Sequence, residues 1–394
     1  MAKILVISPT PTHPQDAGNR ARICSLLSEL RAAGHQIGLA FVAMEEGDLA
    51  AMQAAWGRFW ILPYSRPAER RLKHWGDQLL KAAGSDLVMP YGIDDWFDNS
   101  LLLALAGIAK QFRPDVALVE YAFLSKAFEA FPQVTLKLLD THDALANRHH
   151  RLRQAGLPPM WFYTTTAGEK KALQRADCIL AIQEEERLGF SALTRRPAIT
   201  VGHLARFDQE PWRNAGGGKR LLFVGSVNPL NVAALNWFVE AVFPLLRQRC
   251  PEVCLEIVGD CAQKIPAGEG LLLTGRVEDL GPCYRRATAV VNPVRTGTGL
   301  KIKAIEALAM GCPMVSTRIG CTGLETGAGK AFYVADTADE FAEAVHAILV
   351  SEERQIALSR AALAFSREYN CQALQPLLSY LELWSKNEAG KHKE

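Results

Sequence analysis

Residues 291–324 read VNPVRTGTGLKIKAIEALAMGCPMVSTRIGCTGL, the most informative part of the sequence. An apolar run ends at Asn292, a loop containing two glycines follows, and helical spacing begins near Leu300. A second short apolar run, residues 313–316, comes after the helix. Strand, glycine loop, helix and strand in this order predict a parallel α/β unit.

The loop and the start of the helix have the geometry of an anion site. Gly297 and Gly299 let the backbone approach a ligand closely. The first turn of a helix offers free N–H groups at the positive end of its dipole. Arg295, Lys301 and Lys303 add positive charge, which suits a diphosphate. A plain structural turn with solvated lysines is the alternative that the spacing alone leaves open.

Glu306 lies roughly two turns into the predicted helix, close behind the expected phosphate position. A carboxylate at this place can accept hydrogen bonds from both ribose hydroxyls, as the acidic residue of dinucleotide-binding folds does. The alternative is a solvated glutamate on an exposed helix face.

Similar alternations of apolar runs and helical patterns extend along the rest of the chain. In the second half we expect strands at 220–224, 253–258, 271–273, 289–292 and 313–316, and helices at 233–248, 300–310, 338–350 and 358–384. In the first half we expect strands at 3–7, 37–42, 115–119, 135–139 and 178–182, a helix at 21–33 and a helical insertion at 56–99. A glycine triplet at 216–218 indicates a linker. The pattern therefore predicts two doubly wound α/β domains.

Bulk composition narrows the classes of function. The 394 residues are 49% hydrophobic and 22% charged, enough apolar material for two cores. The net charge is only +2, so no global field recruits nucleic acid. Nine cysteines are scattered without zinc-site spacing, which is typical of a reducing compartment. No apolar run approaches the ~20 residues of a membrane span, so we expect a soluble protein, at most peripheral to a membrane.

The quoted stretch resembles the signature of the retaining GT-B glycosyltransferases of family 4, the group 1 glycosyl transferases. The usual signature has a proline, a Glu-Gly-Phe-Gly loop and a helix reading LEAMA-x-G-x-PVV. A subgroup reads P-x-R-x-G-x-G followed by K-x-x-E-A. The positions that match in register are Pro293, Arg295, Gly297, Gly299, Lys303, Ile305, Glu306, Ala307, Leu308, Ala309, Gly311, Pro313 and Val315.

Weaker matches extend the resemblance over most of the chain. They are Pro11, Gly18, Arg20, Gly34, His35, 223–225, Asn231, Trp237, 257–260 and 274–277. The resemblance implies two Rossmann-like domains that face each other across a cleft holding a nucleotide-sugar donor. We set the domains at residues 1–210 and 211–372. By the same resemblance, a C-terminal helix at about residues 373–394 packs back on the first domain.

The resemblance also implies roles for individual residues. Glu306 would bind the donor ribose, while Arg295 and Lys303 would neutralise the diphosphate, whose charge grows as the glycosidic bond breaks. The wider donor site would consist of Gly18, Gly225, Gly275, Arg276, Val277, Thr298, Gly299, Leu300 and Lys301. We expect no cofactor and no metal, because the basic groups supply the positive charge and no DxD-type motif is placed to bind a cation.

Two features depart from the family pattern. The family's paired glutamates stand eight residues apart, and the position eight before Glu306 is Thr298, which puts the donor sugar in doubt. Many members carry Arg and Lys in the loop after the first strand of the second domain, where residues 226–231 here read SVNPLN. The phosphate charge must then depend more on the basic residues of the 291–324 stretch.

Polar residues also end two strands of the first domain. In the run LLDTHD at 138–143, His142 matches a family histidine near the transferred sugar. It would contact a sugar hydroxyl, or stabilise positive charge at the anomeric carbon through its carbonyl. An exposed loop histidine is the alternative. Glu120 and Asp143 are expected on the acceptor side, with capping or packing as the alternative for Glu120.

Two basic clusters stand apart from these sites. They are Arg66, Arg70, Arg71, Lys73 and His74 beside Trp75, and the run RHHRLR at 148–153. Basic and aromatic side chains on one surface suit anionic lipid or a lipid-diphosphate acceptor. A solvated helix face is the alternative.

The leading hypothesis is a retaining, metal-independent glycosyltransferase that extends a saccharide or lipid-linked acceptor in bacterial surface-glycan assembly. It would act in the cytoplasm or peripherally at the inner face of the membrane. One alternative is a sugar-nucleotide epimerase on the same architecture, which needs no acceptor. Another is a non-catalytic pseudo-transferase, which the threonine at position 298 keeps open.

Overall fold

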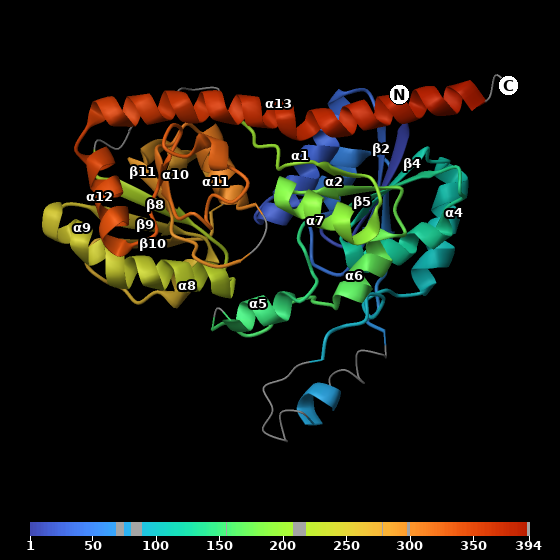
Figure 1. Cartoon of the computed structure of the whole chain (residues 1–394), viewed down its shortest axis with the longest axis horizontal. Coiled ribbons are helices and arrows are strands. Elements are labelled where there is room, and N and C mark those ends of the chain that lie inside the picture. Colours follow the sequence, from blue (N-terminus) through green and yellow to red (C-terminus); the bar gives the residue numbers. More distant parts are fainter. Residues whose placement is uncertain are drawn as a thin grey trace. The chain divides into compact units, whose positions relative to one another are not determined.

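The computed structural model describes residues 1–67, 75–79, 89–154, 156–207, 218–277, 279–297 and 300–391. These residues form two compact units. Unit 1 consists of Met1–Gly202 and Ala373–Glu394, and unit 2 consists of His203–Gln372. The boundary that we expected after residue 210 lies outside the described residues. Each unit contains a parallel sheet flanked by helices, which confirms the predicted α/β class (Figure 1).

Unit 1 is built on a seven-stranded sheet in the order β3-β2-β1-β4-β5-β6-β7. Its strands are β1 Lys3–Ser8, β2 Gln36–Val42, β3 Phe59–Leu62, β4 Val116–Glu120, β5 Leu136–Asp140, β6 Cys178–Ala181 and β7 Ala198–Thr200. Its helices include α1 Gly18–Ala32, α2 Leu49–Trp56, α4 Ser100–Phe112, α5 Arg148–Gln154, α6 Thr166–Leu173 and α7 Glu184–Thr194, with the 3₁₀ segment η1 Ala122–Ala130.

Unit 2 is built on a six-stranded sheet in the order β10-β9-β8-β11-β12-β13. Its strands are β8 Arg220–Val224, β9 Cys254–Val258, β10 Leu271–Gly275, β11 Ala289–Asn292, β12 Met314–Ser316 and β13 Tyr333–Val334. The helical segments are α8 Pro229–Trp237, η2 Phe238–Val242, α9 Phe243–Arg249, η3 Asp260–Lys264, α10 Gly281–Arg286, α11 Ile302–Ala309, η4 Glu325–Gly327, α12 Ala338–Leu349 and α13 Glu352–Lys391.

The central strands are continuous apolar runs because helices cover both faces of each sheet. In β4, all five residues of the sequence VALVE are buried. In unit 2, buried side chains of α8, η2, α9 and α12 form one cluster with the sheet. Phe238 and Phe341 lie at the centre of this cluster with their ring centroids 5.7 Å apart.

Both sheets reverse their strand order at one point, and ligands of open α/β sheets bind at this switch point, beyond the carboxyl ends of the strands. In unit 1 the order reverses between β1 and β4, which pair in parallel. In unit 2 it reverses between β8 and β11. We therefore expect each unit to bind its ligand at the loops that follow these strands.

Short strands account for most differences from the expected elements. We expected a helical insertion over residues 56–99, but Phe59–Leu62 forms β3 and pairs with β2 at the edge of the sheet. That expectation was wrong at this strand, and part of the insertion lies outside the described residues. The strands β7 and β13 were not predicted, since three and two residues are too few to show a period.

The expected helix at 233–248 is divided into three segments. A π-helical turn, η2, separates α8 from α9. Pro244 is the second residue of α9, and a proline has no N–H to continue the α-helical ladder. The helix from Pro229 to Arg249 is also the one described helix that is long and apolar enough to cross a membrane. Its buried residues Leu235, Phe238 and Val242 belong to the core of unit 2.

The last helix, α13, contributes to both units. Its residues through Gln372 belong to unit 2, and those from Ala373 onward belong to unit 1. Leu377 and Leu381 are fully buried in that second part. Burial raises the pKa of the Cys178 thiol to about 12, and the Tyr380 side chain forms a hydrogen bond with this thiol.

Candidate functional site

The switch point of unit 2 is occupied by Lys303 of α11. Its Nζ donates a hydrogen bond to Oδ1 of Asn231 at 2.8 Å and lies 4.5 Å from the ring centroid of Phe223. Asn231 in turn donates to the backbone carbonyl of Ser226 in the loop after β8. The ammonium group is therefore fixed between the ends of β8 and α11.

The pKa of Lys303 is lowered to about 7, chiefly by burial; the charge of Lys301 acts in the same direction, whereas Cys261 opposes the shift. A desolvated ammonium is costly unless an anion lies beside it. The site is therefore set up to gain stability when a negatively charged group binds.

Glu306 lies three residues after Lys303 on α11, so both side chains project from the same side of the helix. The Glu306 side chain is 27% exposed, and its Oε1 lies 3.9 Å from Nε2 of buried His203. Burial raises the pKa of Glu306 to about 7. The two ionisable groups of α11 are thus shifted in opposite directions by the same partial exclusion of water.

Arg295 comes from the loop after β11, and its guanidinium carbon lies 4.9 Å from the ring centroid of Trp237. Gly297 follows with a φ of 110°, and an added Cβ there would lie 3.1 Å from Cδ1 of Leu230. Glycine therefore lets this loop pass close to the start of α8. The predicted helix at 300–310 begins at Ile302.

The other donor-site candidates of unit 2 belong to the loop before α11 or to the end of β10. Thr298 and Gly299 lie outside the described residues. Leu300 is buried, and Lys301 directly precedes α11. Gly275, Arg276 and Val277 follow or end the edge strand β10, where Arg276 Nη2 lies 2.6 Å from Asp260 Oδ2.

Gly225 directly follows β8, and its N–H donates to the carbonyl of Val258 at the end of β9. A Cβ on Gly259, whose φ is 102°, would lie only 2.2 Å from the Gly225 carbonyl oxygen. Gly259 N–H also donates to the carbonyl of Gly275. The ends of β8, β9 and β10 are therefore packed backbone to backbone, which explains why glycines recur at this edge.

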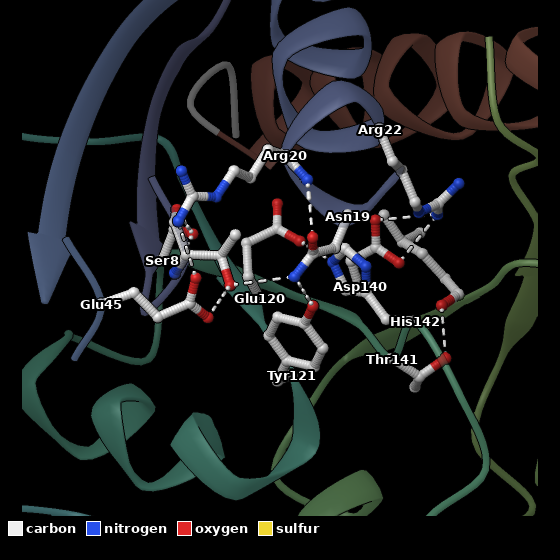
Figure 2. Close-up of polar contacts among 12 residues, drawn as sticks. Ser8, Asn19, Arg20, Arg22, Glu45, Glu120, Tyr121, Asp140, Thr141 and His142 are labelled. Atoms are coloured by element: carbon white, nitrogen blue, oxygen red, sulfur yellow. Dashed lines mark hydrogen bonds and ion pairs between the residues drawn. The ribbon is translucent and has the colours of Figure 1, made fainter. Parts of the chain in front are cut away.

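In unit 1, the ends of β4 and β5 bring together a buried polar cluster (Figure 2). His142 Nε2 lies 2.6 Å from Glu120 Oε2, and both side chains are buried. Nη2 of Arg22, on α1, lies 2.9 Å from each carboxylate oxygen of Asp140. Burial and the nearby charge of Asp140 raise the pKa of Glu120, whereas His142 and Arg22 act in the opposite direction.

Two residues of this cluster adopt left-handed backbone conformations. Tyr121 has a φ of 69° and His142 a φ of 60°. Their rings stack with centroids 4.1 Å apart, and Asn19 Nδ2 donates to the Tyr121 hydroxyl at 3.0 Å (Figure 2). Such backbone strain costs about 1–3 kcal/mol at each residue and is concentrated at functional sites. The strained pair fixes the imidazole at the carboxyl edge of the sheet.

Gly18 opens α1, directly before Asn19 and Arg20. Arg20 forms ion pairs with Asp16 and Glu45. The first turn of α1 contacts the cluster of β4 and β5 through the hydrogen bond from Asn19 to the Tyr121 hydroxyl.

Glu120, Asp140 and His142 bring three possible metal-ligand atoms within 4.8 Å of one another. The guanidinium of Arg22 already neutralises Asp140 and contacts both of its oxygens. A divalent cation here would have to displace Arg22, so the donor set fits a metal poorly.

The remaining acceptor-side candidates differ in exposure. Glu120 contacts His142 and is fully buried, so its carboxylate has no surface exposed to an acceptor. Asp143 is partly exposed, and its Oδ2 lies 2.6 Å from Nη1 of Arg148. The guanidinium carbon of Arg148 lies 5.6 Å from the ring centroid of Trp161.

The structure describes little of the first basic cluster and all of the second. Most of the first, including Arg70, Arg71, Lys73 and His74, lies outside the described residues. In the second, Arg151 donates to the carbonyls of Ala144 and Ala146. Arg151 of this cluster therefore stabilises the loop before α5.

Sequence reasoning missed Arg22, His203 and Trp161. One signal for Arg22 was available in the sequence: it stands between the apolar residues Ala21 and Ile23 in the predicted helix, and both neighbours are buried. His203 and Trp161 stand in segments between regular elements and carry no pattern of their own.

Residues 218–351 match the family model described as Glycosyl transferases group 1. An "Uncharacterized 44.6 kDa protein in cps region" of Klebsiella pneumoniae is 25% identical over 386 residues. That alignment covers 89% of this chain and 92% of the relative.

Several solved structures share the fold across the chain. A mutant of S. aureus TarM, in complex with fondaparinux, alpha-GlcNAc-glycerol and UDP, has a TM-score of 0.68 at 11% identity, covering 98% of this chain and 100% of TarM. Sucrose-phosphate synthase of Thermosynechococcus elongatus has a TM-score of 0.66 at 14% identity, covering 98% and 100%. Anabaena HepE, in complex with UDP and glucose, has a TM-score of 0.64 at 11% identity, covering 97% and 100%. The fold is therefore that of the GT-B glycosyltransferases.

Proposed function

We propose that this chain is a glycosyltransferase of the group 1 family, and that it transfers a sugar from a nucleoside-diphosphate sugar to a saccharide acceptor with retention of anomeric configuration. The match of residues 218–351 to the family model and the shared fold support the family assignment.

The observation that carries the proposal is the pairing of Lys303 and Glu306 on one side of α11 at the switch point. A diphosphate placed beside Lys303 would restore the charge that burial disfavours, with Arg295 from the loop after β11 as a second cation. The carboxylate of Glu306 would accept hydrogen bonds from the ribose hydroxyls. TarM and HepE, which share the fold, have been solved with UDP, and this supports a nucleoside diphosphate.

These groups would act on the leaving group. As the bond between the anomeric carbon and the diphosphate oxygen breaks, negative charge grows on the phosphate. Fixed cations then stabilise the transition state more than the ground state. Lys303 and Arg295 would supply this charge without a metal.

His142 would lie against the transferred sugar. Its backbone strain and its hydrogen bond to Glu120 hold the imidazole and the adjacent carbonyl in one orientation. Such preorganisation is what a group near a developing positive charge requires. Glu120 would act through His142 rather than on the substrate itself.

The setting that we propose is surface-glycan assembly in the cytoplasm or at the inner face of the membrane. The similarity to a protein of the cps region of Klebsiella pneumoniae supports it. The acceptor would be a saccharide or a lipid-linked saccharide.

A thermal-shift screen of UDP, GDP, ADP, CMP and dTDP, each alone and as common sugar conjugates, tests the donor class. A ligand at 100 times its Kd adds about 2.7 kcal/mol to the free energy of unfolding. A clear rise in Tm with one nucleotide supports the proposal, whereas the absence of any rise would contradict it. Binding without turnover of any sugar conjugate would favour a pseudo-transferase, and turnover to an epimeric sugar without acceptor would favour an epimerase.

A further inference from the structure

Trp161 is a partly exposed aromatic side chain held by other rings. It is 38% exposed. Its ring centroid lies 5.1 Å from that of Tyr121 and 5.5 Å from that of Phe123, both in edge-on geometry. Tyr121 and Phe123 are themselves buried. The indole is therefore anchored on the core of unit 1 while part of it faces solvent.

The backbone at Trp161 is strained. Its φ is 57°, in the left-handed region that large side chains avoid. Such strained conformations are concentrated at functional sites, and here the strain accompanies a ring that is partly presented to solvent.

Polar groups flank the exposed ring. Arg148 lies over Trp161, with its guanidinium carbon 5.6 Å from the ring centroid, and its Nη1 lies 2.6 Å from Asp143 Oδ2. The side chains of Arg148 and Asp143 are each 16% exposed. A carboxylate and a guanidinium thus stand beside an aromatic ring at one place on the surface.

Aromatic contacts also link this place to the catalytic candidate of unit 1. Tyr121 contacts Trp161 and stacks on His142 with ring centroids 4.1 Å apart. One side chain therefore separates the exposed ring from the imidazole. A ligand on Trp161 would end close to the position that the transferred sugar would take.

We infer that Trp161, Asp143 and Arg148 form a subsite for a pyranose ring of the acceptor. This inference rests on the proposed transferase function and names the part of the site that receives the acceptor. The apolar C–H face of the sugar packs on the indole, and its hydroxyls bond to the Asp143 carboxylate and the Arg148 guanidinium. In such a site the apolar surface binds the ligand, and a few polar groups fix its orientation.

A lipid surface is the other ligand that an exposed tryptophan can meet. Anionic lipid attracts unpaired basic side chains. Here the charge of Arg148 is neutralised by Asp143. The observations therefore favour a neutral, hydroxyl-rich ring over an anionic membrane.

The test compares the full-length protein with Trp161→Ala and Trp161→Phe, and with Trp75→Ala as a control. Trp75 also belongs to unit 1 and is 65% exposed. The acceptor probes are maltose, lactose, chitobiose and the methyl glycosides of glucose, galactose and N-acetylglucosamine. Two quantities are measured: acceptor KM, and hydrolysis of the donor by water in the absence of acceptor. Saturation-transfer NMR with the same saccharides detects binding without any turnover.

We expect Trp161→Ala to raise the acceptor KM about tenfold or more, as loss of one anchoring aromatic contact does at binding interfaces. Donor hydrolysis should stay within about twofold of wild type, because Trp161 belongs to unit 1 and the diphosphate candidates belong to α11 of unit 2. Trp161→Phe should fall between, and Trp75→Ala should match wild type. The NMR signal transfer should vanish only in Trp161→Ala.

Normal donor hydrolysis with an unchanged acceptor KM in Trp161→Ala would overturn the subsite and leave the transferase proposal standing. Absence of donor hydrolysis and transfer in the wild type would count against the proposed function itself, and the NMR arm would still decide on saccharide binding. Failure of every saccharide to bind the wild type would overturn the inference. So would a Trp161→Ala variant that lost binding to phosphatidylglycerol vesicles while keeping its acceptor KM.

Discussion

His142 Nε2 lies 2.6 Å from Oε2 of Glu120, and neither side chain reaches solvent to more than a slight extent. The second carboxylate oxygen of Glu120, Oε1, is buried without a hydrogen-bond partner among the described residues. A buried carboxylate is costly and is kept where it holds another group in place. Glu120 is therefore a positioning residue for the imidazole.

Glu120→Gln should separate positioning from folding. Glutamine keeps the size of the side chain but removes the charge, so the imidazole loses its charge-assisted partner. We expect kcat to fall roughly 10–100-fold with little change in donor KM, since the interaction acts on the transition state. Steady-state kinetics gives both values, with Glu129→Gln as an exposed control in unit 1. A change in KM with kcat intact would contradict the positioning role.

Lys303→Met should stabilise the protein without ligand, and the sign follows from the pKa. Lys303 has a pKa of about 7 in the folded protein and about 10.4 in an unfolded chain. Between pH 7 and pH 10 the unfolded state binds the proton that the folded state has lost. The free energy of unfolding of the wild type therefore rises with pH across this window. Below pH 7 the folded protein carries the whole cost of the buried charge.

The methionine variant should lack this rise. It should be more stable than wild type by roughly 1–3 kcal/mol at pH 7, with the difference shrinking toward pH 10. It should also lose nucleoside-diphosphate affinity at least about 100-fold. Urea unfolding at several pH values measures the first effect and calorimetry the second. Lys264→Met, at an exposed position, is the control, and equal pH profiles for wild type and Lys303→Met would show that the lysine is not desolvated.

Glu306→Gln tests the ribose assignment. The wild type should bind UDP or its preferred ribonucleotide about tenfold more tightly than the 2′-deoxy analogue, because one hydroxyl contact is lost. In Glu306→Gln the two affinities should converge while the protein stays folded. Calorimetric titration with both nucleotides provides the comparison. A preference for ribose that survives in the variant would show that Glu306 does not contact the sugar of the nucleotide.

The second part of α13 should stabilise unit 1. Leu381→Ala removes a fully buried side chain and should lower the free energy of unfolding by about 2–5 kcal/mol. Leu383→Ala changes a residue of the same helix that is 60% exposed and should stay within about 0.5 kcal/mol of wild type. Urea denaturation measures both variants. Similar stabilities for the two would mean that this part of α13 does not contribute to the core.

The fold was largely predictable because its central strands are continuous apolar runs separated by helical patterns. The runs at 3–7, 115–119 and 220–224 correspond to β1, β4 and β8, which set both switch points. Short edge strands such as β13 carry no period and were missed. Pro244 was visible in the sequence, yet its effect, a π turn, depends on how the helix packs.

The candidate site was predictable only where residues are close in sequence. Lys303 and Glu306 share one helix and were chosen together from their spacing. The partners that shift or fix them come from distant segments: Asn231 for Lys303 and Glu120 for His142. Contacts between segments that are distant in sequence leave no local pattern, so the roles of Arg22 and Trp161 emerged only from the structure.

Release of nucleoside diphosphate from sugar nucleotides by the purified protein tests the proposed transferase activity. UDP-, GDP-, ADP- and dTDP-sugars are incubated with the wild type, Lys303→Met and Lys264→Met, with the saccharide panel as acceptors, and products are followed by chromatography. We predict diphosphate release from one donor class by the wild type and Lys264→Met, and a loss of at least about 100-fold in Lys303→Met. Equal release by Lys303→Met and wild type, or no release from any donor, would contradict the claim that this chain is a nucleotide-sugar-dependent transferase working through α11.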